Sequence, residues 1–447
     1  MEALPESSDH GSPVVVNIVN DGDLLLDVNI ELKSTRLYNK PNHDPAKAKA
    51  TTVQTIYRVS STVLANSSPY FATLIRNGNF REAGLISDAH NSLEAEGVDP
   101  SKADASRLPS ITIFDDNEAT EAAHHHSVFH DMLLALHHRR RILPPPAREF
   151  QHHLATLAII ADRFDCVAAV AEFVDTSNMA KCYSMKTQTN YCGNVVCTEQ
   201  VLRQKILVAY QLDMPTLLST TSRDLIMRGS VLWGPLQEDR VAGWWNLPDG
   251  LEHELRHRRD CILNALASVP DHFLGLYLLK GQRCRMGYNS SLACDAFQLG
   301  QMVKYLKAKG LLFLVDFRPA SIDSIPDTSQ LHVNQIMDLL RRIPNYQIDR
   351  HHSNCGPRVH IQPILDFLRL MLSADAIGIS KTDWKKRRAE VTWDGCLPKD
   401  DGDPSFFFMP SLPPERKKRG RYESKQLSRK ARRLFMAKRW FWTPDGF

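Results

Sequence analysis

Three cysteines and one histidine in the second half of the chain are residue types that bind zinc. These residues are Cys284, Cys294, His352 and Cys355. Thiolates and one imidazole form the closed, tetrahedral shell of a structural zinc site. Only His352 and Cys355 lie close together in the sequence, and the other two are loosely spaced. Because buried free cysteines are common, we prefer core thiols from the sequence, with structural zinc as the alternative.

A second possible metal motif is His253-Glu254-Leu255-Arg256-His257, which matches the H-E-x-x-H pattern of zinc proteases. On a helix, His253 and His257 would share one face and Glu254 would activate a water molecule. However, charged residues flank the motif, and no glutamate follows Glu254 until Glu390. We therefore prefer a solvated, charged helix face, and a zinc metallohydrolase remains the unfavoured alternative.

Histidines are also frequent in the first half of the chain. They form the groups His124-His125-His126, His137-His138 and His152-His153. Adjacent histidines on a helix point in different directions, so we expect surface or helix-end residues and no metal site. The sequence contains no nucleotide-binding loop and no G-x-S-x-G element. These patterns predict no catalytic site and no cofactor other than the possible structural zinc.

The basic residues are concentrated near the carboxyl end. Twelve lysines and arginines lie between Arg416 and Arg439, with Glu423 as the only acidic residue. Such clusters can serve in nuclear import, contact nucleic acid or simply favour solubility, and all three interpretations stay open. The candidate import residues are Arg416, Lys417, Lys418, Arg419, Arg429, Lys430, Arg432 and Arg433.

The composition indicates a soluble intracellular protein. The chain has 447 residues, of which 43% are hydrophobic, enough for two or three packed domains. No uninterrupted apolar run approaches the ~18 residues of a membrane-spanning helix. The N-terminus lacks the pattern of a secretory signal, so the nine cysteines are expected to be reduced. We expect the nucleus or the cytoplasm, and neither secretion nor membrane insertion.

The elements that must position these residues follow from hydrophobic spacing. In the first half, residues 14–19 and 24–28 predict a hairpin, and residues 55–59 and 111–113 predict strands. Ser67-Ser68-Pro69 predicts a helix start. Residues 29–52 and 84–108 are polar and are expected to be surface insertions. Further helices are expected at 127–138, 150–164, 167–174, 200–210, 251–269, 294–308 and 361–372.

The predicted organisation is an α+β domain followed by a mainly α-helical region. A disordered N-terminus covers 1–13, the α+β domain 14–176 and a linker 177–199. The helical domain covers 200–397, and a mobile basic tail covers 398–447.

Several local motifs resemble the BTB/POZ family. The segments that carry the resemblance are Gly22–Leu26, Tyr57–Phe71, Leu108–Phe114, Phe129–His138 and Leu154–Cys166. The segments Glu254–Ile262, Cys294–Gly300 and His352–Gly356 resemble the C-terminal region of fungal members. The resemblance implies a small sheet flanked by helices and a protein-interaction module without catalytic residues.

The resemblance implies protein partners, namely a homodimer or a heterodimer with another BTB chain. Alternatives are a substrate adaptor of a cullin-type ubiquitin ligase and a nuclear, transcription-associated factor. Nucleic acid is not expected as a partner, except through the basic tail. Animal BTB factors resemble this chain at Asp23, but the His-Arg pair that follows in them is replaced by Ser60-Ser61. The charged pocket of those relatives is therefore not expected in the same form.

Overall fold

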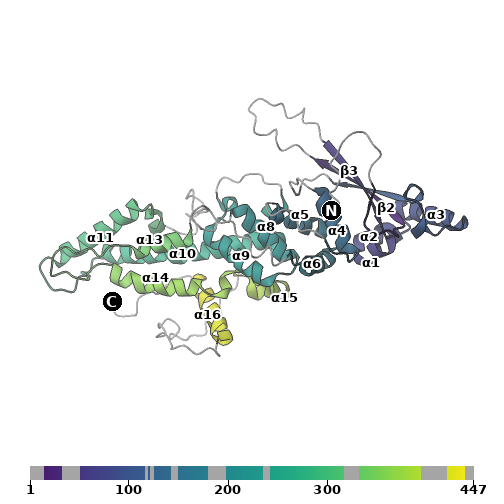
Figure 1. The fold of residues 1–447 in the computed structure, drawn as a ribbon. Coiled ribbons are helices and arrows are strands. Elements are labelled where there is room, and N and C mark those ends of the chain that lie inside the picture. Colours follow the sequence, from purple (N-terminus) through teal and green to yellow (C-terminus); the bar gives the residue numbers. More distant parts are fainter. Residues whose placement is uncertain are drawn as a thin grey trace, which may run out of the picture. The chain divides into compact units, whose positions relative to one another are not determined.

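The structure is a computed structural model that describes residues 15–32, 51–115, 119–120, 125–141, 149–179, 198–234, 242–316, 332–393 and 420–437. It divides into two compact units. Unit 1 comprises Met1–Met214 and Arg240–Asn246, and unit 2 comprises Pro215–Asp239 and Leu247–Phe447. Unit 1 contains a small four-stranded mixed sheet with helices, and unit 2 is mainly helical (Figure 1). The predicted α+β class is confirmed at this level.

The sheet of unit 1 contains β1 (Val15–Asn17), β2 (Leu24–Leu32), β3 (Thr51–Val59) and β4 (Ser110–Asp115). Their order is β1-β3-β2-β4, with β2 antiparallel to β3 and parallel to β4. The predicted hairpin of β1 with β2 is wrong, because β1 pairs with β3 in parallel. Both edges of β2 are already occupied by β3 and β4, so β1 cannot pair with β2 and lies at the outer edge of β3.

The turn into β2 ties the sheet to α1 (Ser61–Ser67). A side chain at Gly22 would come within 2.7 Å of the backbone oxygen of Val59, so the close approach requires glycine. The carboxylate of Asp23 accepts hydrogen bonds from the backbone N–H (2.7 Å) and hydroxyl (2.6 Å) of Ser61. Asp23 thus binds Ser61, the first residue of α1. Ser60 and Ser61 are the two residues that stand in place of a His-Arg pair.

The helices of unit 1 mostly match the predicted segments. The predicted start at Ser68-Pro69 is confirmed, because the Ser68 hydroxyl accepts a hydrogen bond from the Phe71 N–H (3.1 Å). The expected insertion at 84–108 instead contains a helix whose Leu93 packs with Leu25 of β2. The helices are α1, α2 (Pro69–Arg76), α3 (Arg81–Ala95), α4 (His125–Leu136), α5 (Phe150–Arg163), α6 (Val167–Thr176) and α8 (Glu199–Gln211), with 3-10 turns η3 (Pro100–Lys102), η4 (Ala105–Arg107) and η6 (Gly243–Trp245).

Helix α8 belongs to unit 1, although residues 200–210 were predicted to open the C-terminal domain. It packs against α5 and η6. Trp244 of η6 is fully buried, and its ring lies 5.2 Å from that of His152 on α5. The apolar face that α8 and η6 share with α5 explains why the boundary lies later than the composition suggested.

Unit 2 is built around the long helix α10 (Leu251–Leu278), which contacts α9, α11, η8, α14 and α16. The predicted helix ended before Pro270, but the helix continues through this residue. The other elements are α9 (Pro215–Arg228), η5 (Val231–Trp233), η7 (Pro248–Gly250), α11 (Ser291–Ala308), η8 (Leu312–Asp316), α13 (Val333–Arg341), α14 (Arg358–Leu372), η10 (Asp375–Ile377), α15 (Lys381–Val391) and α16 (Gly420–Phe435).

Helix α16 corrects the prediction of a mobile tail for residues 420–437. Its residues Ala431, Leu434 and Phe435 are buried. The Phe435 ring stacks on Trp393, with 6.0 Å between the ring centroids. An amphipathic pattern of three apolar positions among many cations is enough to hold this helix on unit 2.

One described stretch, residues 243–278, is long and apolar enough to cross a membrane. Half of its most apolar window is buried inside the protein. The central helix of a soluble protein passes the same test, so this finding is weak support for a membrane span.

Candidate metal centre

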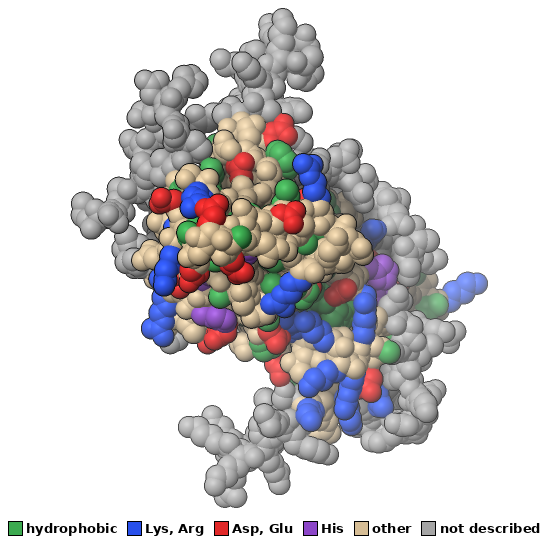
Figure 2. Space-filling view, turned by 90° about the vertical axis from the view of Figure 1, so that its right-hand side faces the viewer, with side chains coloured by type: hydrophobic (Ala, Val, Ile, Leu, Met, Phe, Trp, Pro, Cys, Tyr) green, Lys and Arg blue, Asp and Glu red, His purple; other side chains and the backbone are tan. Residues whose placement is uncertain are grey.

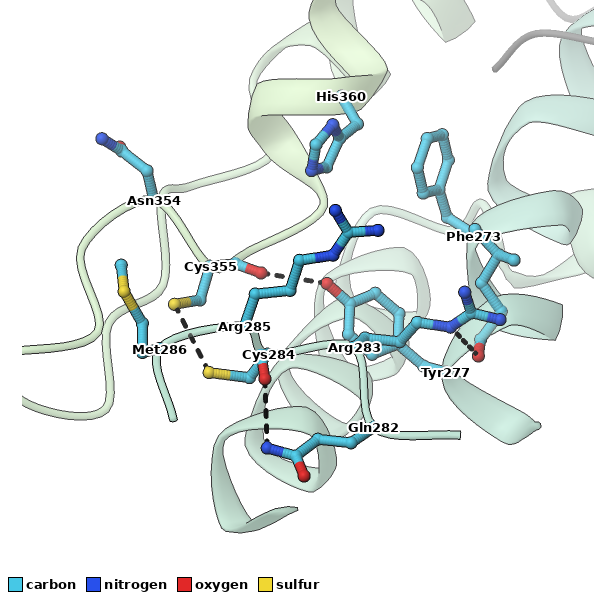
Figure 3. A pocket seen from close by; sticks show the side chains of 11 residues that line it. Phe273, Tyr277, Gln282, Arg283, Cys284, Arg285, Met286, Asn354, Cys355 and His360 are labelled. Atoms are coloured by element: carbon cyan, nitrogen blue, oxygen red, sulfur yellow. Dashed lines mark hydrogen bonds between the residues drawn. The ribbon is translucent and has the colours of Figure 1, made fainter. Parts of the chain in front are cut away.

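The four candidate zinc ligands of unit 2 lie close together, and we call them the Cys/His cluster: Cys284, Cys294, His352 and Cys355. Their three sulfurs and one ring nitrogen all lie within 4.8 Å of one another. Cys284 lies in the segment after α10, Cys294 in the first turn of α11, and the other two before α14. The fold thus brings together residues that are up to 71 positions apart. Figure 3 shows two of the sulfurs facing each other beside a pocket.

The distances among three of the four ligand atoms, those of Cys284, His352 and Cys355, are close to those of a tetrahedral metal shell. Zinc lies about 2.3 Å from sulfur and about 2.0 Å from nitrogen, so tetrahedral ligands are about 3.5–3.8 Å apart. The Cys284 and Cys355 sulfurs are 3.8 Å apart. His352 Nδ1 lies 3.2 Å from the Cys284 sulfur and 3.8 Å from the Cys355 sulfur. The cysteines are free, since a disulfide would require about 2.05 Å.

The orientation of His352 is fixed by its second ring nitrogen. Nδ1 faces the sulfurs, and Nε2 lies 2.9 Å from the hydroxyl oxygen of Ser290. The backbone N–H groups of His351 and His352 donate to the Asp349 carboxylate, at 2.8 and 3.2 Å. In metal sites, such a partner on the far nitrogen selects the tautomer that leaves the other nitrogen as a ligand.

The loop that carries Cys284 is held by Asp295 of α11. The Asp295 carboxylate accepts hydrogen bonds from the backbone N–H groups of Arg283 (2.6 Å) and Cys284 (2.9 Å). On the other side, the Tyr277 hydroxyl donates to the backbone oxygen of Cys355 (3.1 Å), and Asn354 adopts a left-handed backbone with φ of 60°. The protein therefore positions the cluster through hydrogen bonds to the backbone of its loops.

The pKa values of the three thiols differ because of their burial and their proximity to one another. Burial, followed by the charges of Cys284 and Cys355, raises the pKa of the Cys294 thiol to about 12. Burial and then the hydrogen bond with Cys284 raise the pKa of Cys355. Burial would also raise the pKa of Cys284, but hydrogen bonds from Ser291 and the Met286 backbone outweigh it and lower that pKa. Cys284 is therefore the most acidic of the three thiols.

A pocket of about 300 Å³ adjoins the cluster. Phe273, Tyr277, Arg283 and Arg285 are among its lining residues, together with Cys284 and Cys355 (Figure 3). Cys294 and His352 do not line it. This pocket was not predicted from the sequence, because its walls come from the end of α10, the following loop, the loop before α14 and the start of α14.

The H-E-x-x-H motif on α10 does not form a metal centre with other described residues. The rings of His253 and His257 lie 6.4 Å apart, but Glu254 points into the core. Its carboxylate accepts hydrogen bonds from Arg258 Nε (2.6 Å) and the Trp393 backbone N–H (3.0 Å). A buried carboxylate paired with a guanidinium is not placed to activate a zinc-bound water.

The predicted solvated helix face is also wrong at Arg258 and Arg259, which are each 1% exposed. Arg258 lies over the Trp393 ring, 5.1 Å from its centroid, and donates to backbone oxygens of η10 and α15. We call Glu254, Arg258 and these acceptors the charged hub. The acceptors lie 2.8–3.2 Å from the guanidinium nitrogens of Arg258 and are the backbone oxygens of Ala376, Ile377, Gly378 and Val391.

Two of the histidines that were expected at the surface or at helix ends are buried, although His137 does lie at the end of α4. His137 has Nδ1 2.8 Å from the backbone oxygen of Leu133, and its Nε2 accepts the N–H of Ser60 (3.1 Å). His153 lies 2.7 Å from the carboxylate of Asp131. Burial lowers the pKa of His137. His138 is exposed, as predicted, and the side chains of His124, His125 and His126 lie outside the description.

The candidate import residues fall into two groups. Arg416, Lys417, Lys418 and Arg419 lie outside the described residues, whereas Arg429, Lys430, Arg432 and Arg433 lie on α16. Arg432 is used within unit 2, where it donates to the Thr392 backbone oxygen (2.5 Å). Lys and Arg side chains gather in the lower part of Figure 2. Nuclear import stays a prediction.

Comparisons with protein-family models, with curated proteins and with solved structures find no match for this chain.

Proposed function

We propose that the Cys/His cluster binds one structural zinc ion that holds the loops of unit 2 together. The observation that carries this proposal is the convergence of four ligand atoms within 4.8 Å, at nearly tetrahedral spacing. Three of the residues are buried, and Cys294 and His352 are fully so. A bound cation stabilises three thiolates at once, which accounts for the grouping of three thiols so close together.

Zinc fits this ligand set better than other common ions do. Three sulfurs and one imidazole nitrogen exclude calcium and magnesium, which prefer oxygen ligands. Four protein ligands also complete a tetrahedral shell and leave no open position for water or substrate. The function of the ion is therefore structural rather than catalytic.

The ion would replace a hydrophobic core where the loops cannot supply one. Cys284 and Ser290 belong to residues 279–290, which contain no helix or strand. Residues 342–357 before α14 are likewise without a helix or strand. One zinc ion joins these two loops to the start of α11, and thereby fixes the ends of α10, α11 and α14.

Metal analysis of the purified full chain tests the proposal. We expect about one zinc per chain in the unaltered protein, and less than about one tenth of that in Cys294→Ser, because one lost thiolate opens the shell. Cys261→Ser is the matched control, since Cys261 lies on α10 outside the cluster. An unaltered protein that takes up no zinc from added zinc salt, while correctly folded, overturns the proposal.

A second candidate function is a BTB/POZ-type protein-interaction module in unit 1. The order of elements supports it: the antiparallel pair β2 and β3, the helices α1, α2 and α3, then β4 parallel to β2, then α4, α5 and α6. This is the sheet flanked by helices that the sequence resemblance implies. In such a module, apolar faces and strand edges bind a second copy or another chain of the same kind.

The mass of the full chain in solution tests this second proposal. Size-exclusion chromatography with light scattering at micromolar concentration is expected to give twice the chain mass of 50.7 kDa. A strictly monomeric protein under these conditions, with no self-association on tenfold concentration, would contradict self-pairing.

A further inference from the structure

We propose that Cys284 and Cys355 form an oxidation site, at which a peroxide converts the zinc-bound thiolates into a disulfide and releases the ion. This inference rests on the proposed zinc function and adds a regulatory chemistry to it. Its basis is an asymmetry among the four ligands, because only Cys284 and Cys355 line the pocket and their sulfurs are neighbours.

The pocket provides the access. Cys284 and Cys355 line it, whereas Cys294 and His352 are fully buried elsewhere. The pocket holds about 300 Å³, many times the roughly 30 Å³ that one water molecule occupies in the liquid. Hydrogen peroxide is little larger than water, so the pocket is large enough to admit it beside the two cysteines that line it. Figure 3 shows both sulfurs beside this space.

The positions of the two sulfurs favour a disulfide between them. They are 3.8 Å apart, and both residues lie in loops rather than in helices. Closing this gap to about 2.05 Å requires a shift of less than two ångströms, shared between two loops. Cys294 is held in the first turn of α11, where its backbone N–H donates to Ser290 (2.8 Å), and is less able to move.

The reaction balances with peroxide as the only oxidant. The Cys355 thiolate attacks one peroxide oxygen, the O–O bond breaks, and the hydroxide that leaves takes up a proton from solvent to become water, which gives a sulfenic acid at Cys355. The Cys284 thiolate then attacks the Cys355 sulfur, and the hydroxide that leaves takes up a proton as a second water. Two thiolates lose two electrons in total, and peroxide gains them. Zinc keeps only Cys294 and His352 and dissociates.

The experiment uses the zinc-loaded full chain and hydrogen peroxide, with a chromogenic zinc chelator to record release. We expect release of about one zinc per chain, a Cys284–Cys355 disulfide in peptide mapping, and rebinding of zinc after treatment with a thiol reductant. A disulfide that involves Cys294, or irreversible oxidation without any disulfide, would overturn the inference.

Two variants that each retain four zinc ligands distinguish oxidation at Cys284 and Cys355 from oxidation at the other ligands. Cys355→His cannot form the disulfide, and peroxide-driven release should slow at least about tenfold. Cys294→His keeps both pocket thiols, and its release rate should stay within about threefold of the unaltered protein. Equal slowing in both variants contradicts the inference, and peptide mapping of the unaltered protein decides the matter if either variant fails to fold.

The two proposals fail in different ways. A chain that contains no zinc before peroxide is added refutes the structural zinc site. A chain that holds one zinc but does not release it with peroxide leaves the zinc site intact and refutes the oxidation site.

Discussion

The charged hub and the Cys/His cluster lie toward opposite ends of α10, and they hold unit 2 together by different means. The hub neutralises its charges within the chain, because Arg258 binds the Glu254 carboxylate and four backbone oxygens. The cluster gathers three thiols and one imidazole without any cationic side chain among its ligands. One end of α10 is therefore held by a salt bridge within the chain, and at the other end we propose an ion.

This difference matters because both sites join the same kinds of elements. The hub connects α10 to η10, α15 and Trp393, and the cluster connects the loop after α10 to α11 and the loop before α14. A salt bridge and a metal ion can thus serve the same mechanical purpose. They differ in what can undo them: mutation disrupts both, but chelation and oxidation act on the cluster alone.

The largest effect is expected from loss of the hub cation. Arg258→Ala leaves the Glu254 charge buried without a partner, so the free energy of unfolding should fall by about 3–5 kcal/mol. Urea denaturation followed by circular dichroism measures the change. Arg256→Ala on the exposed side of the same helix is the control and should cost less than about 1 kcal/mol. A similar cost for both variants would show that the hub has no special role.

Zinc removal should have the next largest effect. At zinc concentrations about 1,000 times the dissociation constant, binding adds about 4 kcal/mol to the free energy of unfolding. Thermal denaturation with and without a chelator should therefore separate the zinc-loaded chain from the metal-free chain. The Arg258→Ala protein should show the same zinc-dependent gain. An unfolding curve that does not respond to chelation would contradict the assigned role of the ion.

The hydrogen bond behind His352 should contribute a smaller amount. Ser290→Ala removes the partner of Nε2, and loss of such a partner weakens metal affinity about 10–100-fold, or about 1.4–2.7 kcal/mol. Competition with a chelator of known affinity measures the change. The exposed neighbour Asn289 offers the control Asn289→Ala, which should leave affinity unchanged. If both variants bind zinc equally well, Ser290 does not orient the ligand.

The smallest expected effect is the coupling between the two sites. Arg258 and Tyr277, which contacts the cluster, are separated by nineteen residues of α10, or about 28 Å along the axis. The effects of Arg258→Ala and Cys294→Ser on the free energy of unfolding should therefore add within about 0.5 kcal/mol. A larger coupling energy in the double variant would mean that the two ends of α10 are not independent.

Much of the helical framework could be predicted from sequence because its apolar spacing is strong. Helices α5, α11 and α14 lie close to the predicted ranges. The ligands of the cluster could also be named as candidates, since only thiols and imidazoles suit a structural zinc. Their convergence could not be predicted, because Cys284 and His352 are 68 residues apart and only the packing of three helices brings them together.

The predictions from the sequence were wrong where the type of a residue does not match its environment in the fold. Arg258 and Arg259 are charged and were expected in solvent, but backbone oxygens of distant segments satisfy their donors in the core. Helix α3 was overlooked because only Ala83, Ile86 and Leu93 of its fifteen residues are buried. In both cases the deciding partners are remote in the chain, and local patterns do not reveal them.

The zinc K-edge X-ray absorption spectrum of the purified full chain tests the central claim most directly. We predict a first shell of three sulfurs at about 2.3 Å and one nitrogen at about 2.0 Å. In Cys355→His, the same spectrum should change to two sulfurs and two nitrogens. A first shell made only of oxygen and nitrogen, or no bound zinc at all, would contradict the account.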